Sequence, residues 1–457
     1  MARKAATVFA CTACGAQSPQ WIGRCPECGG WSTLVEERSV DAPPRGGAAS
    51  ASSAASVSSA PVRLSDVAAA AVPRIPTGIG DMDRVLGGGL VPGSVVLVGG
   101  EPGIGKSTLL LQVAARLSER LGSVLYVSAE ESAQQVKMRA DRLNASAPGL
   151  FLLPETSLEN ILEAAKARVF GAIVVDSIQT IASSDSPAAT GSVTQVRACA
   201  GLLSALAKTT GVPIFLIGHV TKDGTLAGPK TLEHLVDAVL SFEGERFHAH
   251  RVVRALKNRF GPVHELGIFE MTGAGLVQVA NPSALYLGSG AGSRPGSVVL
   301  GAVEGTRPLL LEVQALTVEA KYGSPRRTAI GFDGTRLALL LAVLERHGDV
   351  KLSSYDVFLN VAGGAESAEP AADLAVAAAV AGSFRSRALP PGTVVFGEVG
   401  LLGEVRAVSD AALRLKEAVS LGFRSALIPA GNAGEAAAFP DLAAVPLRSV
   451  EELLLKS

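Results

Sequence analysis

The residues best suited to chemistry form a glycine-rich segment in the first quarter of the chain. The segment Gly100-Glu101-Pro102-Gly103-Ile104-Gly105-Lys106-Ser107-Thr108 has the spacing Gly, four residues, Gly-Lys-Ser. In a loop of this pattern the backbone N–H groups face a polyphosphate, the Lys ammonium reaches its terminal phosphates and the Ser hydroxyl binds Mg²⁺. The segment predicts an ATP site in which Lys106 is catalytic and Ser107 is a magnesium ligand, with an ordinary turn as the alternative.

The segments around this loop favour nucleotide binding over an ordinary turn. Residues 94–99 are an apolar run that predicts a buried strand, and residues 108–117 have the periodicity of an amphipathic helix. Further strand-like runs at residues 124–128, 172–176 and 213–218 alternate with helical patterns. This alternation predicts an α/β fold, with a parallel sheet covered by helices on both faces.

Carboxylates follow two of these strand-like runs. Asp176 ends one run, and Glu130 and Glu131 follow the run before it. Because ligands bind at the carboxyl ends of parallel strands, Asp176 is placed to hold Mg²⁺ with Ser107, and Glu130 to activate the attacking water. Either acid alone is as well explained as a solvated or helix-capping residue.

Four of the five cysteines lie in the first 28 residues: Cys11, Cys14, Cys25 and Cys28. Two C-x-x-C pairs so close together can supply four thiolates to one tetrahedral Zn²⁺, and the alternatives are a redox pair or free thiols. We expect the two tryptophans beside them, Trp21 and Trp31, to form the small core of this module. Stacking on nucleic-acid bases is the other role open to them.

The bulk composition limits where and how the protein acts. The chain has 457 residues, of which 48% are hydrophobic, but no run of about 18 apolar residues occurs without a charge or a helix breaker. We therefore expect no membrane span, and a cytoplasmic location because only a short apolar stretch follows the first charges. The net charge of −1 means that any contact with nucleic acid depends on a local basic surface.

Two local groups of cations are candidates for such a surface. Residues 221–230 contain Lys222 and Lys230 among Gly and Pro residues that prevent a regular element, as in a mobile loop lining a DNA channel, with an ordinary surface turn as the alternative. Lys257 and Arg259 follow a core-strand run, and on a strand they would point to the same side. They could reach a phosphate on a neighbouring subunit, grip DNA or form surface ion pairs.

Several motifs together resemble the bacterial RadA (Sms) family of recombination and repair proteins. They are the cysteine pairs, the phosphate loop, residues 174–180, residues 218–230 and Lys257-Asn258-Arg259-Phe260-Gly261. The resemblance implies a RecA-type ATPase that forms a ring, a hexamer, on single-stranded and branched DNA, drives branch migration and partners the RecA recombinase. It also implies that Glu130 activates water and that His219 senses the γ-phosphate.

The last part of the chain resembles the proteolytic domain of Lon, which uses a Ser-Lys dyad. Aligned without gaps, the Ser and Lys positions fall on Ala371 and Ala412, so we expect no peptidase chemistry. An ATP-dependent protease is thus the disfavoured alternative, and a RecA-like nucleotide switch is a third. We expect a zinc ribbon at residues 1–35, a linker at 36–60, a RecA-like ATPase domain at 61–280 and a Lon-like domain at 281–457.

Overall fold

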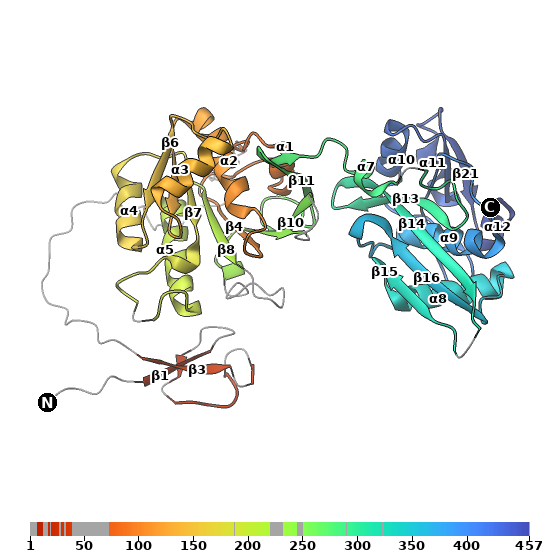
Figure 1. Ribbon diagram of the computed structural model, residues 1–457, viewed down its shortest axis with the longest axis horizontal. Coiled ribbons are helices and arrows are strands. Elements are labelled where there is room, and N and C mark those ends of the chain that lie inside the picture. Colours follow the sequence, from red (N-terminus) through yellow and green to blue (C-terminus); the bar gives the residue numbers. More distant parts are fainter. Residues whose placement is uncertain are drawn as a thin grey trace, which may run out of the picture. The chain divides into compact units, whose positions relative to one another are not determined.

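A computed structural model gives the structure of the chain (Figure 1). It describes residues 7–11, 17–18, 20–26, 29–31, 33–38, 73–186, 188–219, 232–244, 250–288, 290–321 and 324–456. The chain divides into two compact units, Met1–Gln278 and Val279–Ser457, and each is considered by itself. Among the described residues, no helix combines the length and the apolar character that crossing a membrane requires.

A three-stranded antiparallel sheet begins the chain. Its order is β2-β1-β3, from β1 (Thr7–Cys11), β2 (Gln17–Ser18) and β3 (Leu34–Arg38). Cys11 and Cys25 are buried in a small cluster with Leu34. The expectation that the tryptophans form this core is wrong, because Trp21 is 57% and Trp31 73% exposed.

The first unit also contains a nine-stranded sheet in the order β12-β11-β10-β9-β4-β8-β7-β5-β6. The strands are β4 (Val95–Gly100), β5 (Val124–Ser128), β6 (Leu150–Pro154), β7 (Ala172–Asp176), β8 (Ile214–His219), β9 (Ala238–Glu243), β10 (His250–Asn258), β11 (Leu266–Thr272) and β12 (Gly275–Gln278). The strands from β9 to β6 in this order are parallel, as expected for this α/β class. Beyond β9, the strands β10, β11 and β12 are antiparallel, because the short connections between them leave no room for a crossover.

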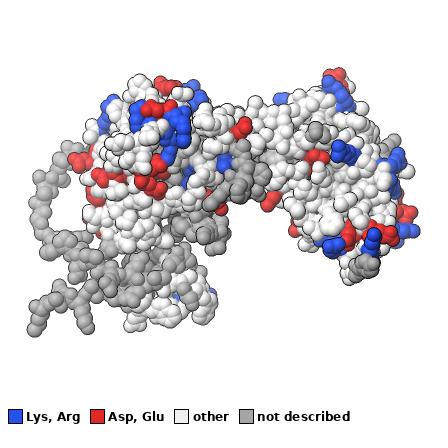
Figure 2. Space-filling view, viewed as in Figure 1, with Lys and Arg blue, Asp and Glu red and all other residues white. Residues whose placement is uncertain are grey.

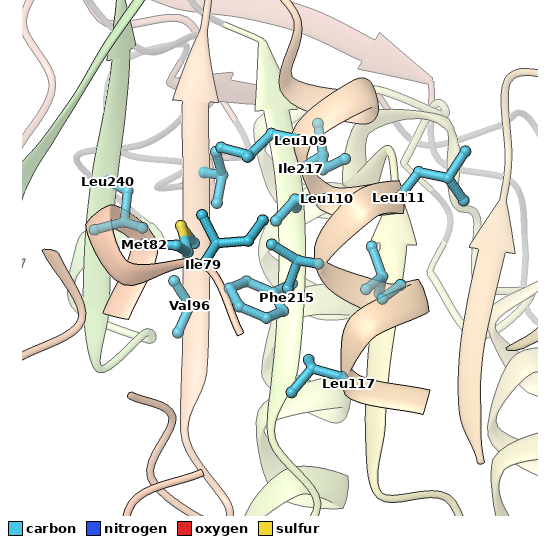
Figure 3. Packing of buried hydrophobic residues seen from close by; sticks show 14 of the residues in the cluster. Ile79, Met82, Val96, Leu109, Leu110, Leu111, Leu117, Phe215, Ile217 and Leu240 are labelled. Atoms are coloured by element: carbon cyan, nitrogen blue, oxygen red, sulfur yellow. The ribbon is translucent and has the colours of Figure 1, made fainter. Parts of the chain in front are cut away.

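Helices cover both faces of this sheet. They are α1 (Gly80–Val85), α2 (Lys106–Leu121), α3 (Ala133–Arg142), α4 (Leu158–Ala167) and α5 (Val193–Thr210), with the short helix η2 (Ile178–Thr180). Because side chains alternate along a strand, Val96 and Val98 of β4 join the core under α1, α2 and α3, whereas Val95 and Leu97 join the core under α4 and α5. In the first core, Leu110 and Leu117 of α2 face Phe215 of β8 (Figure 3).

The second unit is built on a seven-stranded mixed sheet, β15-β16-β14-β13-β17-β20-β21. Its strands are β13 (Ser297–Glu304), β14 (Arg307–Glu319), β15 (Arg327–Ile330), β16 (Tyr355–Val361), β17 (Thr393–Val395), β20 (Ser425–Pro429) and β21 (Ala443–Leu447), and a separate pair is formed by β18 (Glu398–Val399) and β19 (Val405–Arg406). The helices are α7 (Ser283–Tyr286), α8 (Gly334–Gly348), α9 (Asp373–Arg385), α10 (Ala411–Ser420), α11 (Ala433–Ala436) and α12 (Val450–Lys456), with η3 (Ala362–Gly364), η4 (Pro370–Ala372) and η5 (Ala430–Asn432). Residues 373–382 of α9 are all buried, which makes α9 the central helix of this unit.

The two positions matched to the Lon dyad lie on η4 and on α10. Ala371 is buried and Ala412 is exposed, and neither side chain carries a nucleophile or a base. The segments that carry them are joined by an ion pair in which Arg414, 2% exposed, donates two hydrogen bonds to the Glu369 carboxylate at 2.9 and 2.7 Å. Arg414 also donates to the carbonyl oxygen of Gly301 at 2.7 Å, so this region is held together by structural bonds.

Candidate nucleotide-binding and catalytic site

The glycine-rich segment forms the turn between β4 and α2. The strand ends at Gly100 and the helix begins at Lys106, with Gly105 in the left-handed region at φ 118°. A Cβ atom at Gly105 would lie 2.8 Å from Cε of Met271, and one at Gly100 would lie 2.7 Å from the carbonyl oxygen of Phe242. These glycines are therefore required because the loop passes close to β9 and β11.

Lys106 is buried at the base of this loop, 3% exposed. Its ammonium donates to the carbonyl oxygens of Gly100 at 2.7 Å and Glu101 at 2.8 Å. Burial lowers the pKa of Lys106 to about 8, although the nearby carboxylates of Asp176 and Glu130 oppose this shift. The ammonium is thus held where terminal phosphates would be expected, bonded to carbonyl groups that a phosphate can replace.

The lowered pKa of Lys106 predicts that binding of MgATP takes up a proton. With a pKa of about 8, about one tenth of the Lys106 side chains are neutral at pH 7 and about nine tenths at pH 9. Because phosphate oxygens favour the ammonium, we expect proton uptake to rise from near zero at pH 7 towards one per site at pH 9. Calorimetric titrations in buffers of different ionisation enthalpy measure it.

The matched control for this titration is Lys106→Arg, whose guanidinium stays charged over the whole pH range. The Arg variant should show no increase in proton uptake between pH 7 and pH 9. Equal uptake by the wild-type protein at the two pH values would contradict the prediction.

His219, the last residue of β8, connects Lys106 to Glu130. Its Nδ1 lies 3.3 Å from the Lys106 ammonium, and its Nε2 lies 3.1 Å from Oε1 of Glu130. An ammonium only donates and a carboxylate only accepts, so both contacts are satisfied by a neutral His219 with its proton on Nε2. The side chain of Ser177 also donates to Glu130, and the bonds from His219 and Ser177 lower the pKa of that carboxyl group.

Asp176 lies at the carboxyl end of β7, as the sequence predicts. It is 7% exposed, and it accepts a hydrogen bond at 2.6 Å from the hydroxyl group of Tyr126 on β5. Burial and the neighbouring carboxylate raise the pKa of Tyr126 well above its usual value, so the phenol remains a donor. A carboxylate held in this way, close to Lys106 and to the first turn of α2 that carries Ser107, fits a ligand of Mg²⁺.

The strand order β4-β8-β7-β5 explains how this site is assembled. Neighbouring parallel strands bring the phosphate loop, His219, Asp176 and the segment carrying Glu130 to one edge of the sheet. Glu131, the other acid considered, pairs with Arg139. The sequence reasoning missed Ser177 and Tyr126 as partners of the acids. Ser177 adjoins Asp176 and could have been suspected, but Tyr126 has the pattern of a core residue.

Lys257 and Arg259 lie at the opposite end of the sheet from the phosphate loop. Lys257 pairs with Val239 of β9, and the backbone N–H of Arg259 donates to the carbonyl oxygen of Asp237. The backbone N–H of Asp237 in turn donates to the carbonyl oxygen of Val95, the first residue of β4. The six residues from Val95 to Gly100 span about 17 Å. These cations therefore cannot reach the phosphate loop of their own chain.

Both side chains contact the segment that leads into β9. The Lys257 ammonium donates to the carbonyl oxygens of Glu233 and, at 2.8 Å, Val236. Arg259, half exposed, pairs with the buried Asp237 carboxylate at 3.1 Å. Burial and the neighbouring Arg259 lower the pKa of Lys257. Because β10 ends before Arg259, the expectation based on two residues of one strand does not apply, although both cations bind residues 233–237.

Other predicted site residues lie outside the part of the chain that the structure describes. These are Lys222 and Lys230 of the proposed DNA loop and the zinc ligands Cys14 and Cys28. On the face shown in Figure 2, Lys and Arg side chains are interspersed with Asp and Glu, and no continuous basic surface is seen among the coloured residues. This face agrees with the near-zero net charge.

Comparison with known proteins identifies the family. Residues 62–225 match the model of the AAA domain, and residues 9–36 match that of the rubredoxin metal binding domain. The DNA repair protein RadA of Bacillus subtilis is 50% identical over 429 residues, covering 94% of this chain and 93% of that protein. The chain belongs to the RadA family. The RadA of Pseudomonas aeruginosa is 51% identical over 432 residues, or 94% of each chain.

Membership of the RadA family confirms the main predictions from sequence. The chain is an ATP-hydrolysing enzyme of DNA repair, with an α/β ATPase core around the phosphate loop and a zinc-ribbon domain before it. Among solved structures, a KaiC-like protein of Pyrococcus horikoshii matches with a TM-score of 0.38 and 21% identity, covering 46% of this chain and 99% of that protein. That score is too low to support an argument about the fold.

Proposed function

We propose that this RadA family member is a DNA-dependent ATPase that acts in the cytoplasm as a hexameric ring. It binds single-stranded and branched DNA, partners the RecA recombinase and drives branch migration during homologous recombination. The observation that carries the proposal is the hydrogen-bonded chain from Lys106 through His219 to Glu130. His219 directly precedes residues 220–231, which contain Lys222 and Lys230, so a change at the γ-phosphate has a short route to the proposed DNA loop.

Within this proposal each group at the phosphate loop has one role. Lys106 neutralises charge on the β- and γ-phosphates, and Glu130 accepts a proton from the attacking water. Asp176 and Ser107 hold Mg²⁺, which when bound polarises the phosphates. His219 senses the γ-phosphate, because withdrawal of Lys106 towards ATP removes one of the two contacts that hold the imidazole.

The remaining parts of the chain have supporting roles in the proposal. Cys11, Cys14, Cys25 and Cys28 hold one structural Zn²⁺, and the burial of Cys11 and Cys25 in one cluster supports this. Residues 36–60 link the zinc ribbon of residues 1–35 to the ATPase domain of residues 61–280. Residues 281–457 act as a Lon-like scaffold for ring assembly or DNA contact, and the alanines at the dyad positions argue against a protease.

Electrophoretic mobility shifts with single- and double-stranded DNA test the proposed function directly. With a non-hydrolysable ATP analogue, we expect the wild-type protein to bind single-stranded DNA at least about tenfold more tightly than without nucleotide. The double variant Lys222→Ala/Lys230→Ala should lose DNA affinity and keep its affinity for ATP, because each lost phosphate contact weakens binding and reduces its salt dependence.

The matched control is Lys208→Ala, which removes an exposed lysine from the last turn of α5. Its DNA affinity should equal that of the wild-type protein. Equal affinity with and without nucleotide, or a double variant that binds DNA normally, would contradict the proposed coupling.

A further inference from the structure

A second buried cation lies beside the phosphate loop, next to residues 101–104. Arg251 of β10 is 7% exposed. Its Nε donates to the carbonyl oxygen of Ile104 at 3.1 Å, and its Nη1 donates to the carbonyl oxygen of His250 at 2.8 Å. One guanidinium group therefore joins the middle of the phosphate loop to the backbone of a core strand.

The strand register explains why Arg251 reaches this carbonyl. Val253 of β10 pairs with Phe242 of β9, and Phe242 pairs with Gly100, the residue from which the phosphate loop leaves β4. Two residues before Val253, Arg251 is thus level with the loop itself. A Cβ atom at Gly244 would lie 3.0 Å from Cδ of Arg251, so the glycine at this position leaves the path of the side chain open.

The contact matters because of how such a loop binds phosphate. Where its N–H groups turn inward to the anion, the carbonyl groups of the same peptide units turn outward and need donors of their own. Arg251 supplies a donor from a planar, rigid fork whose burial is compensated by two carbonyl groups. A small pocket of about 320 Å³ beside it is lined by residues 101–104, Gly244 and Arg251.

We propose that Arg251 is a positioning residue for ATP binding. It holds the Ile104 carbonyl group so that the N–H groups of residues 103–106 stay turned towards the phosphates before ATP arrives. ATP then binds a loop that is already ordered. Because binding does not have to order the loop, the entropy cost is smaller and the affinity for ATP is higher. Arg251 acts through the loop backbone, whereas Lys106 acts on the phosphates.

Binding of a fluorescent, non-hydrolysable ATP analogue by the full chain tests the proposal, together with steady-state kinetics. Arg251→Met removes both donors and the charge at similar length, and we expect the dissociation constant to rise about tenfold while kcat at saturating ATP stays within about twofold. Arg251→Gln keeps an N–H donor without the charge, and Arg251→Lys keeps both a donor and the charge. The dissociation constants of these two variants should therefore lie between those of the wild-type protein and Arg251→Met.

The matched control is Arg254→Met, three residues along β10, whose side chain pairs with Glu243 at 3.4 Å. Its affinity for the analogue should not change. A purely structural role would lower the melting temperature and the active fraction of Arg251→Met and leave the affinity of the folded fraction at the wild-type value.

Two other results would overturn the proposal. If Arg251→Met binds the analogue with wild-type affinity, the Ile104 contact has no effect on binding. If Arg251→Lys binds with wild-type affinity while Arg251→Gln binds as weakly as Arg251→Met, only the charge matters. If the Met variant does not fold, the comparison of Gln and Lys with the wild-type protein still decides between positioning and charge.

Discussion

Replacing Lys106 with Ala should lower the rate of ATP hydrolysis by about 10²- to 10³-fold and leave the fold intact. The ammonium stabilises charge that develops on the transferred phosphoryl group, and groups of this kind typically contribute that much to the rate. The folded state tolerates the change because Lys106 is buried at a free-energy cost that alanine avoids. Release of inorganic phosphate, followed colorimetrically, measures the effect.

The matched control is Lys137→Ala, which removes an exposed lysine of α3 that pairs with Asp141 on the surface. Its turnover should equal that of the wild-type protein, and both variants should melt within a few degrees of it. Turnover by Lys106→Ala close to the wild-type rate would refute the assignment of the phosphate loop.

Replacing Lys257 with Ala should also reduce DNA-stimulated ATP hydrolysis sharply, because we propose that Lys257 and Arg259 act on the nucleotide of a neighbouring subunit. A cation supplied by a neighbour contributes about 10³- to 10⁵-fold in other phosphoryl-transfer enzymes. The geometry supports action between subunits, since Lys257 lies at the end of the sheet opposite its own phosphate loop. Phosphate release in the presence of single-stranded DNA measures the loss.

Mixed rings separate this role from the two alternatives. Rings made only of Lys257→Ala subunits or only of Lys106→Ala subunits should be inactive. A mixed ring contains interfaces with both lysines intact, so activity should recover.

If Lys257 instead binds DNA, its loss should weaken DNA binding and lower the slope of the salt dependence by about 0.7 for each contact. If it only holds the carbonyl groups of Glu233 and Val236, the variant should melt earlier. No recovery in rings shown to exchange subunits would contradict action between subunits.

The parallel part of the sheet could be predicted closely because its strands are short apolar runs bounded by breakers. The runs at 124–128 and 172–176 coincide with β5 and β7, and the run at 213–218 is displaced by one residue from β8. Of the antiparallel strands, β10 was expected only as the core-strand run before Lys257, without its pairing, and β11 and β12 were not predicted. Their apolar and charged residues give no regular period, and their pairing depends on tight connections, including the turn before Gly275 at φ 105°.

Only the part of the site that lies within one segment of the chain could be predicted from the sequence. The spacing around Lys106 identifies a phosphate loop without reference to any other part of the chain. The contact of Tyr126 with Asp176 requires β5 beside β7, and the contact of Arg251 with Ile104 requires a register that passes through three strands. Hydrophobic periodicity sets which face of a strand is buried, but it does not set which strand lies next to it.

The ion pair of Glu369 and Arg414 bears on the evolutionary history of the second unit. Glu369 precedes Ala371 by two residues and Arg414 follows Ala412 by two, so the pair joins the two segments that would carry a protease dyad. Loss of either partner alone leaves an uncompensated charge, at a cost of about 3–5 kcal/mol. Substitution of Glu369 and Arg414 one at a time therefore passes through a poorly folded protein, and only substitution of both residues together avoids it.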